Sequence, residues 1–488
     1  MRRTLEKAAN AGAQTRVSEL VFLRSVLDGT MYDCLQFDFH QERTSSGEYI
    51  PIAKRRPSVR YNLCRLVVED SISLLFGNGR FPAVSCADAQ AAETLKAVID
   101  ETGLCEVMQE AAFKGSIGSV AILMRALKMR LFFDVLDTLY LTPEWDPQAP
   151  DTLLRVTEKY TAKGDVLAGM GYAIDPDDYA KIFWFQRVWD GLAETWFLPW
   201  PVAQAGEPQV PQIDDARTVQ HNLGFVPIVW IKNIAGASGD IDGICTFKPA
   251  IDNQIEIEYQ LSQGGRGLKY SSDPTLLIKE PAGDDGKLVR SSSSALVVDK
   301  DGDAKLLEIS GSAVGAVIDY VRALRELGVE SIHGNRSNAD KISAAQSGRA
   351  LEMMHQSLIW LADRLRTSYG ERGVLPLLRM VVQARAKLPL KLFGDDMPAF
   401  PVGMRLKLVW PPWFHPTERD KVEQTNRVNS AYAAGLISHE QALTVMSEAN
   451  GVADVAAETA KIAADTAAKD QRAAALGAQV KASETLTA

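Results

Sequence analysis

A single helical pattern, from Ser343 to about Lys387, limits what this chain can fold into more than any other feature of the sequence. Its large apolar residues recur at spacings of three and four, which places them on one face of a helix. They are Leu351, Met354, Leu358, Leu361 and Leu365. At about 1.5 Å per residue, such a helix would span roughly 60 Å, which is longer than a small globular core needs. The pattern therefore predicts either a long helix in a large α/β protein or a spine that packs against copies of itself around an axis.

The ends and the interior of this pattern carry further signals. Ser343 is suited to cap the start of the helix, because its hydroxyl can accept a bond from a free backbone N–H group. Pro376 removes one N–H group inside the pattern, and its ring collides with the carbonyl one turn earlier, so we expect a kink there. A shorter helical pattern, Ser312 to Leu327 closed by Gly328, comes before it. The polar stretch HGNRSNADK, from His333 to Lys341, lies between the two.

The composition is that of a large globular protein. With 488 residues, of which 46% are hydrophobic and 24% charged, the chain can bury a sizeable core in several domains. Its net charge of −9 disfavours tight DNA binding, because proteins that grip phosphates are usually basic. The five cysteines show no metal-ligand spacing, which indicates free thiols in a reducing compartment. No signal peptide or membrane span is evident, so we expect a protein made and folded in the cytoplasm.

The region before residue 126 is predicted to be largely helical. One helix runs from about Ser58 to Phe76 with Gly77 as its cap, and a helix pair covers residues 88–113. The expected buried face of the first helix contains Leu63, Leu66, Val67, Ser71 and Leu74. The stretch KGSIGSVAILMR, residues 114–125, resembles a phosphate-binding loop only superficially, because it lacks the lysine and hydroxyl of that motif. We expect its glycines to permit close packing instead.

Residues 151–232 are rich in the β-branched and aromatic residues that favour strands. Six of the nine tryptophans fall between Trp145 and Trp230, which predicts a well-packed β layer. We expect these aromatics to form a core rather than a platform for stacking bases. HNLGFVPIVWIKN, residues 221–233, predicts a turn and a buried strand, and GASGDIDGI, residues 236–244, predicts a flexible link.

A helix follows from Phe247 to about Ser262, with Gly264 and Gly265 as its predicted end. It is acidic through Asp252, Glu256 and Glu258. Residues 266–309 predict three short strands, with DKDGD as the hairpin turn between the last two. DKDGD also begins like a calcium loop, but Ala304 replaces the required glycine and Ser310 the final glutamate, so we reject that interpretation.

The last part of the chain predicts one strand and then helices. Residues 404–416, MRLKLVWPPWFHP, predict a strand that stops at Pro411 and returns the chain to the β layer. Residues 417–446 are helical, with a helix–turn–helix corner at AGLIS, residues 434–438. Residues 451–488 contain 14 alanines but few large apolar residues, which favours a helix that frays or depends on neighbours.

Taken in order, these parts resemble the portal protein of tailed bacteriophages. Four stretches resemble that family directly, and their order and spacing matter more than any one of them alone. They are LLFGNG (74–79), HNLGFVPIVWIKN followed by GDIDG (221–243), SAAQSGRALEMM (343–354), and WPPWFHPTERDKVE through GLIS (410–438). The resemblance covers most of residues 58–445.

The resemblance implies an α+β fold with a β-rich wing, two stem helices, a small β clip, a long kinked spine helix and a helical crown. The implied ranges are 1–57 for an N-terminal segment, 58–246 for the wing, 247–265 and 310–330 for the stem helices, 266–309 for the clip, 331–343 for a tunnel loop, 344–415 for the long kinked helix and returning wing strand, and 416–488 for the crown and C-terminal tail.

The resemblance also implies a function. Copies of the chain would form a ring, probably of twelve, at one capsid vertex of a virion assembled in the cytoplasm of a host bacterium. Double-stranded DNA would pass through the ring during packaging and ejection. The terminase large subunit and then a head-completion or adaptor protein would dock on it, beside major capsid and scaffolding proteins. No membrane partner, cofactor or metal is implied, and a separate motor protein would hydrolyse ATP.

Three sets of candidate site residues follow from the resemblance. The tunnel-loop set, which would face DNA, is His333, Asn335, Arg336, Ser337, Asn338 and Lys341. The stem set, which would line the channel, is Asp252, Glu256 and Glu258. The clip set, which would contact docking proteins, is Lys279, Lys287 and Arg290. From the residues alone, the loop also fits a surface loop with incidental charges. The stem acids equally fit a solvated helix face or salt bridges between subunits.

The sequence offers little for an enzyme. None of the six histidines lies in a metal-binding HExxH spacing, and neither a GxSxG elbow nor a Walker A motif is present. We therefore expect no catalytic activity. The alternatives are another structural or scaffolding protein of a phage head and, less favoured, a hydrolase with an unrecognised site. Assembly state separates these classes, because a portal forms a very large ring.

Overall fold

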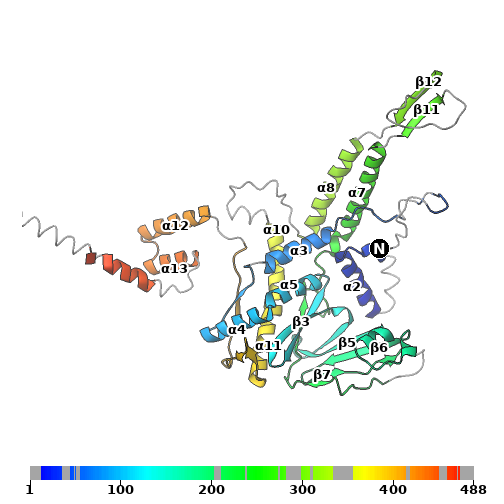
Figure 1. Cartoon of the computed structure of the whole chain (residues 1–488). Helices are drawn as coiled ribbons and strands as arrows, with labels where there is room; N and C mark the ends of the chain where they lie inside the picture. Colours follow the sequence, from blue (N-terminus) through cyan, green and yellow to red (C-terminus); the bar gives the residue numbers. More distant parts are fainter. Residues whose placement is uncertain are drawn as a thin grey trace, which may run out of the picture. The chain divides into compact units, whose positions relative to one another are not determined.

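The computed structural model describes two compact units of the chain (Figure 1). The first contains Met1–Arg336 and Gln356–Pro411, and the second contains Ser337–His355 and Pro412–Ala488. Within them, the described residues are 13–35, 44–48, 50, 55–77, 79–202, 210–236, 239–272, 275–281, 298–307, 312–333, 355–413, 418–449, 459–469 and 471–472.

Two antiparallel sheets form the strand-rich part of the first unit. The smaller has the order β10-β2-β3, with β10 at Ile228–Lys232, β2 at Ser119–Leu127 and β3 at Arg130–Leu136. The larger has the order β4-β5-β6-β7-β9, with β8 paired to β6. Its strands are β4 Leu141–Trp145, β5 Leu153–Lys163, β6 Ile182–Trp189, β7 Ala193–Trp196, β8 Trp200–Pro201 and β9 Val219–Gln220. The prediction of a strand-rich region over residues 151–232 is confirmed.

The two sheets share one hydrophobic core. Its buried members are Ala121, Leu123, Leu141, Val156, Trp189, Val226, Ile228 and Trp230. Alternation along β6 explains how this sheet builds a core on one face, since Phe183, Phe185, Arg187 and Trp189 are buried while the residues between them are less so. A second cluster lies where the short helix α6, Gly164–Gly169, covers β5 and β6.

The tryptophans divide between this core and the opposite face of the larger sheet. Trp189 and Trp230 are buried, as predicted. Trp184 and Trp200 are only half-buried, and the Lys159 ammonium lies 4.9 Å and 5.6 Å from their ring centroids. The prediction of an all-core role is therefore wrong for these two residues, because period-2 alternation turns Trp184 away from its buried neighbours.

In the described part of the chain, four α-helices come before β2 in the sequence, and the last two of them contact strands of the smaller sheet. They are α2 Ala13–Leu27, α3 Leu63–Phe76, α4 Ala89–Thr102 and α5 Leu104–Gly115. The helix pair predicted over 88–113 is confirmed as α4 and α5, which join at Gly103 in the left-handed region (φ 58°). The α3 helix starts later than predicted, because the Asn62 side chain caps it by accepting from the Arg65 N–H group. Leu66 was assigned wrongly to the buried face, since it is 44% exposed.

The long helix predicted over residues 343–387 is described from residue 356 onward. It consists of α10 (Gln356–Leu365), a π-helical segment η7 (Arg366–Val374) and α11 (Leu375–Lys387). The irregularity thus precedes Pro376, which lies in the first turn of α11 where a missing N–H group is tolerated. Gly370 and Gly373 permit close packing here, since a Cβ at either would come within 3.0 Å of a neighbouring side chain. Ser343 lies outside the described residues.

Two helices, α7 (Ile251–Ser272) and α8 (Ser312–Ser331), run side by side as a hairpin (Figure 1). Both helices extend beyond their predicted ends. The α7 helix continues through Gly264 because a Cβ there would lie 3.1 Å from Val317 Cγ1, so the missing side chain lets α8 approach. The α8 helix continues through Gly328, where a Cβ would lie 3.0 Å from Leu63 Cδ2. Tertiary packing offsets the weak helix propensity of glycine, about 1 kcal/mol per residue.

Between these helices in sequence, β11 (Thr275–Pro281) pairs antiparallel with β12 (Val298–Leu307). The predicted turn at DKDGD is wrong, because these residues lie inside β12 and Asp303 pairs with Lys279 across the ladder. Pairing along the ladder overrides the local turn signal. The first residues of the second predicted strand, SALVVDKD, are 294–297 and lie outside the described residues.

The strand predicted over residues 404–416 is short and lies elsewhere than expected. It appears as β15 (Lys407–Val409), which pairs with β1 (Ala83–Ser85) rather than with either larger sheet. A second small ladder joins β13 (Lys391–Leu392) to β14 (Asp395–Asp396).

In the second unit, α12 (Glu418–Ala433) and α13 (His439–Ala449) confirm the predicted helix–turn–helix corner. Gly435 supplies the left-handed turn residue (φ 70°), and the Ser438 hydroxyl accepts from the Gln441 N–H group at 3.1 Å. Residues 459–469 are helical, which confirms the predicted helix in that part of the tail.

Candidate functional site: the helical hairpin and its base

The base of the α7–α8 hairpin is fixed first by apolar packing. Leu63 of α3, Ile257 of α7 and Val329 of α8 form a buried cluster, with Leu261 and Leu324 packed against it. The hairpin therefore stands on the start of α3. This junction brings together two regions that are nearly 200 residues apart in the sequence.

A buried polar row on α7 completes this attachment. Gln254, Glu258 and Ser262 recur every four residues, and each is at most 3% exposed. Their side-chain oxygens accept hydrogen bonds from backbone N–H groups of the segment that leads into α3. The Ser262 hydroxyl accepts from Ser58 and Val59 at 2.9 and 3.0 Å, Glu258 from Tyr61 at 3.0 Å, and Gln254 from Cys64 at 3.0 Å. One helix face thus satisfies three N–H groups of a non-repetitive segment and one N–H group in the first turn of α3.

Glu258 is the centre of this row. Besides the Tyr61 N–H group, it accepts from the Tyr32 hydroxyl at 2.5 Å and from the Gln254 amide at 3.2 Å. Burial raises the pKa of the Glu258 carboxyl, while these three hydrogen bonds and the nearby Arg60 act in the opposite direction. Burial also raises the pKa of the Tyr32 hydroxyl, which therefore stays a donor. The carboxyl is a structural acceptor at the foot of the hairpin.

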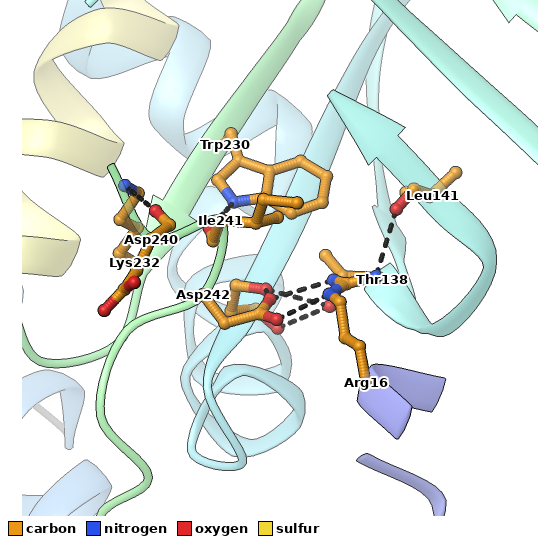
Figure 2. Close-up of polar contacts among 9 residues, drawn as sticks. Arg16, Thr138, Leu141, Trp230, Lys232, Asp240, Ile241 and Asp242 are labelled. Carbon is orange, nitrogen blue, oxygen red and sulfur yellow. Dashed lines mark hydrogen bonds and ion pairs between the residues drawn. The ribbon is translucent and has the colours of Figure 1, made fainter. Parts of the chain in front are cut away.

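A second polar cluster fixes the loop that carries GDIDG, residues 239–243. Asp242 forms a bidentate ion pair with Arg16 of α2, with N–O distances of 2.5 and 2.9 Å (Figure 2). Asp242 also accepts from the Ser119 hydroxyl, and the Thr138 hydroxyl donates to the Ser119 carbonyl at 3.0 Å. Figure 2 shows the Arg16 guanidinium between Asp242 and Leu141, and it donates to the Leu141 carbonyl at 3.2 Å. One carboxylate therefore joins the N-terminal helix to the start of β2.

The rest of this loop is held from the other side. The Trp230 indole donates to the Ile241 carbonyl at 3.0 Å, and the Lys232 ammonium donates to the Asp240 carbonyl (Figure 2). Gly118 lets the loop approach, since a Cβ there would lie 3.3 Å from Asp242 Cβ. The prediction of a flexible link is therefore wrong for the described residues 239–244. The prediction that the glycines of GSIGS permit close packing is confirmed.

The structure separates the three predicted stem acids. Asp252 is exposed and Glu256 is half-buried, whereas Glu258 is 2% exposed. Glu258 is thus wrong as a residue of a channel wall, because its carboxylate faces the base of its own chain. Asp252 has no hydrogen-bond or ion-pair partner among the described residues, and Glu256 accepts from Gln260 at 2.7 Å.

The loop and clip candidates fall mostly outside the described residues. Of the tunnel-loop set only His333 is described; it is exposed and has a left-handed backbone (φ 55°). The others, Asn335, Arg336, Ser337, Asn338 and Lys341, lie outside, as do Lys287 and Arg290 of the clip set. Lys279 lies in β11, opposite Asp303 in the register.

Sequence reasoning missed the residues that build the base. Gln254 and Ser262 share a period of four with Glu258, a signal that is visible in the sequence but equally typical of a solvated helix face. Arg16 and Asp242 are 226 residues apart, and nothing local in the sequence pairs them. Among the described residues, no group of three or more His, Cys, Asp or Glu is arranged to hold a metal ion. Within the same part of the chain, no helix combines the length and apolar character needed to cross a membrane.

The chain has weak similarity to two solved structures of gene transfer agent particles. No family model and no curated protein matches the chain. One similar solved structure is a chain of the neck of an empty GTA particle computed with C6 symmetry, at 14% identity and a TM-score of 0.37. Another is a chain of the virion of a native gene transfer agent (GTA) particle, at 14% identity and a TM-score of 0.34. Each match covers 79% of this chain and 88% of the other.

Proposed function

We propose that this chain is a tailed-bacteriophage portal protein, a subunit of the ring at one capsid vertex through which double-stranded DNA is packaged and ejected. The observation that carries the proposal is the α7–α8 hairpin. The two helices overlap the residue ranges for which the resemblance implies stem helices, and β11 and β12 lie between them in the sequence, within the range implied for the clip. At about 1.5 Å per residue, α7 and α8, with 22 and 20 residues, are each roughly 30 Å long.

The surface of the hairpin supports assembly into a ring. The exposed side chains include Ile318, Tyr320 and Leu327, which are 45%, 48% and 58% exposed. Apolar side chains gathered on the flanks of one hairpin are typical of a surface that a partner covers. In a ring, each copy covers one flank of its neighbour, and a head-to-tail contact of this kind closes when rotation returns to the start.

The charge of the chain supports passage of DNA rather than capture. A net charge of −9 disfavours the dense phosphate contacts that would hold a duplex in place. In the proposal, Arg336 and Lys341 of the tunnel loop make the few cationic contacts, and Asn335, Ser337 and Asn338 add weak polar ones. The clip, with Lys279, Lys287 and Arg290, receives first the terminase large subunit and then a head-completion or adaptor protein. The chain itself has no catalytic role, and its place is in the virion beside the capsid and scaffolding proteins.

Measurement of particle mass tests the proposal. The purified chain, 53.4 kDa, should assemble into a closed species of about twelve copies in mass photometry and sedimentation. A chain that remains a monomer or small oligomer at every concentration, with and without scaffolding and capsid proteins, contradicts the proposal.

A packaging assay tests the tunnel loop separately. Replacing Arg336 and Lys341 together by alanine should leave the ring intact but change DNA packaging or retention. A matched variant, in which the exposed Lys96 and Lys163 are neutralised, should package normally. Unchanged packaging and retention in the loop variant removes the loop from the proposal.

A further inference from the structure

The α7–α8 hairpin has two flanks of different chemistry. On α8, Val317, Val321 and Leu324 turn toward α7 and its base cluster. Because each residue advances the helix by about 100°, residues one position before this row project to one flank and residues one position after it to the other. Tyr320 and Leu327 belong to the first flank, because each comes one position before a residue that faces inward, Val321 and Gly328 respectively. Ile318, Arg322 and Arg325 make the second flank.

On α7 the same rule assigns the acids. Asn253, Ile257 and Gly264 turn toward α8, so Asp252 and Glu256, one position earlier, project to a flank. Since the helices are antiparallel, the earlier-residue flanks of α7 and α8 lie on the same side of the hairpin. The opposite side of α7 is the polar row with Glu258, which is covered at the base by residues 58–64.

The first flank is thus acidic and apolar, and the second is cationic and apolar. Glu256, Tyr320 and Leu327 stand on the first, with Asp252 beside them. Arg322 and Arg325 on the second are both exposed. Arg322 lies 3.5 Å from Asp319 of its own helix, and Arg325 has no ion-pair partner among the described residues.

The two flanks also match in height along the hairpin. Gly328 lies against Asn253, and Gly264 lies against Val317. Arg325, three residues before Gly328, is therefore level with Glu256, three residues after Asn253. Ile318 and Tyr320 are two residues apart on α8, so their heights along the hairpin differ by about 3 Å.

We infer that the first flank of one copy packs on the second flank of the next, with Glu256 of one hairpin paired to Arg325 of its neighbour and Tyr320 against Ile318. The inference rests on the proposed ring and names the surfaces that close it. Rotation about a ring axis parallel to the hairpin brings opposite flanks together without a shift in height, which is what the matched levels require. It also assigns Asp252 and Glu256 to the contact between subunits rather than to the channel wall.

Charge reversal on the full-length chain tests the pair. In E256R two positive charges meet at every contact, and in R325E two negative charges meet there. The protein concentration at half-assembly should therefore be about tenfold higher for either variant than for the wild type. The double variant E256R/R325E restores opposite charges at every contact and should assemble close to the wild type. The matched control is E326R, one residue from Arg325 but directed away from both flanks, and it should assemble normally. Mass photometry over a concentration series, at low and at physiological salt, gives the half-assembly concentration of the wild type and of each variant.

The outcomes separate the inference from the proposal beneath it. If the wild type forms rings and both single reversals form them equally well, the flank pairing is wrong while the ring stands. If both single variants fail and the double variant fails with them, although each folds as judged by circular dichroism, the pairing of these two residues is also wrong. If the wild type never forms a ring, the proposed function and the inference fall together.

Discussion

Glu256 and Glu258 lie two residues apart on one helix and have opposite surroundings. Glu258 is buried and accepts hydrogen bonds from Tyr32, Tyr61 and Gln254 of its own chain. Glu256 lies on a flank of the hairpin, where Gln260 donates a hydrogen bond to it. The base of the hairpin is thus fixed within one chain, while its flanks leave polar and apolar groups exposed, and we infer that these groups face another copy. Folding of the subunit and assembly of subunits should therefore respond to different substitutions.

The largest expected effect is at the base. E258A leaves three donors without an acceptor, two of them buried, and it should lower the free energy of unfolding by about 3–5 kcal/mol. E256A, on the flank, should change it by no more than about 0.5 kcal/mol. Urea unfolding followed by tryptophan fluorescence measures both. Equal effects of the two substitutions would end the distinction between base and flank.

The GDIDG loop offers a second matched pair. D242A removes the bidentate bond to Arg16 and the acceptor for Ser119, so it should cost about 2–3 kcal/mol. D240A should cost about 0.5 kcal/mol or less, because it is the backbone carbonyl of Asp240, not its carboxylate, that Lys232 contacts. Limited proteolysis near the N-terminus provides an independent measure, since α2 should be cut faster in D242A alone.

Neighbouring apolar residues of α8 sharpen the comparison further. V329A removes methyl groups from the base cluster and should cost about 2 kcal/mol. L327A removes a larger side chain that is 58% exposed, and it should change the stability of the subunit by less than about 0.5 kcal/mol. Ring formation should instead be weakened more by L327A than by V329A. A destabilised L327A subunit would show that this flank is covered within the chain.

The smallest expected effect is on pH dependence. The Glu258 pKa is raised, so the folded chain binds this proton more tightly than the unfolded chain does. Its contribution to stability is therefore complete below the unfolded pKa, about 4.3, and is lost as pH rises through the folded value. The unfolding temperature of the wild type minus that of E258Q should fall as pH rises from about 4 toward neutrality. A difference that is constant or increases over this range contradicts the assignment.

The sequence predicts elements better than their contacts. Periodicity locates α3, α4, α5 and the helical part of residues 356–387, because an amphipathic pattern is a local signal. Gly264, Gly328 and DKDGD mislead, because their local preference for ends and turns is overcome by packing between α7 and α8 and by pairing of β11 with β12. Exposure of the stem acids could not be predicted either. Asp252, Glu256 and Glu258 look alike in the sequence, and only the chain segments packed on α7 make them different.

Electron microscopy of the purified, assembled chain is the most direct test of the central claim, that copies stand with their α7–α8 hairpins side by side around a hole. The account predicts an annulus with a bore wide enough for a B-form duplex, in which the hairpins line the narrow part and Glu256 of each copy faces Arg325 of the next. Assemblies that lack a through-hole, or a ring whose hairpins point outward and do not touch one another, would contradict it.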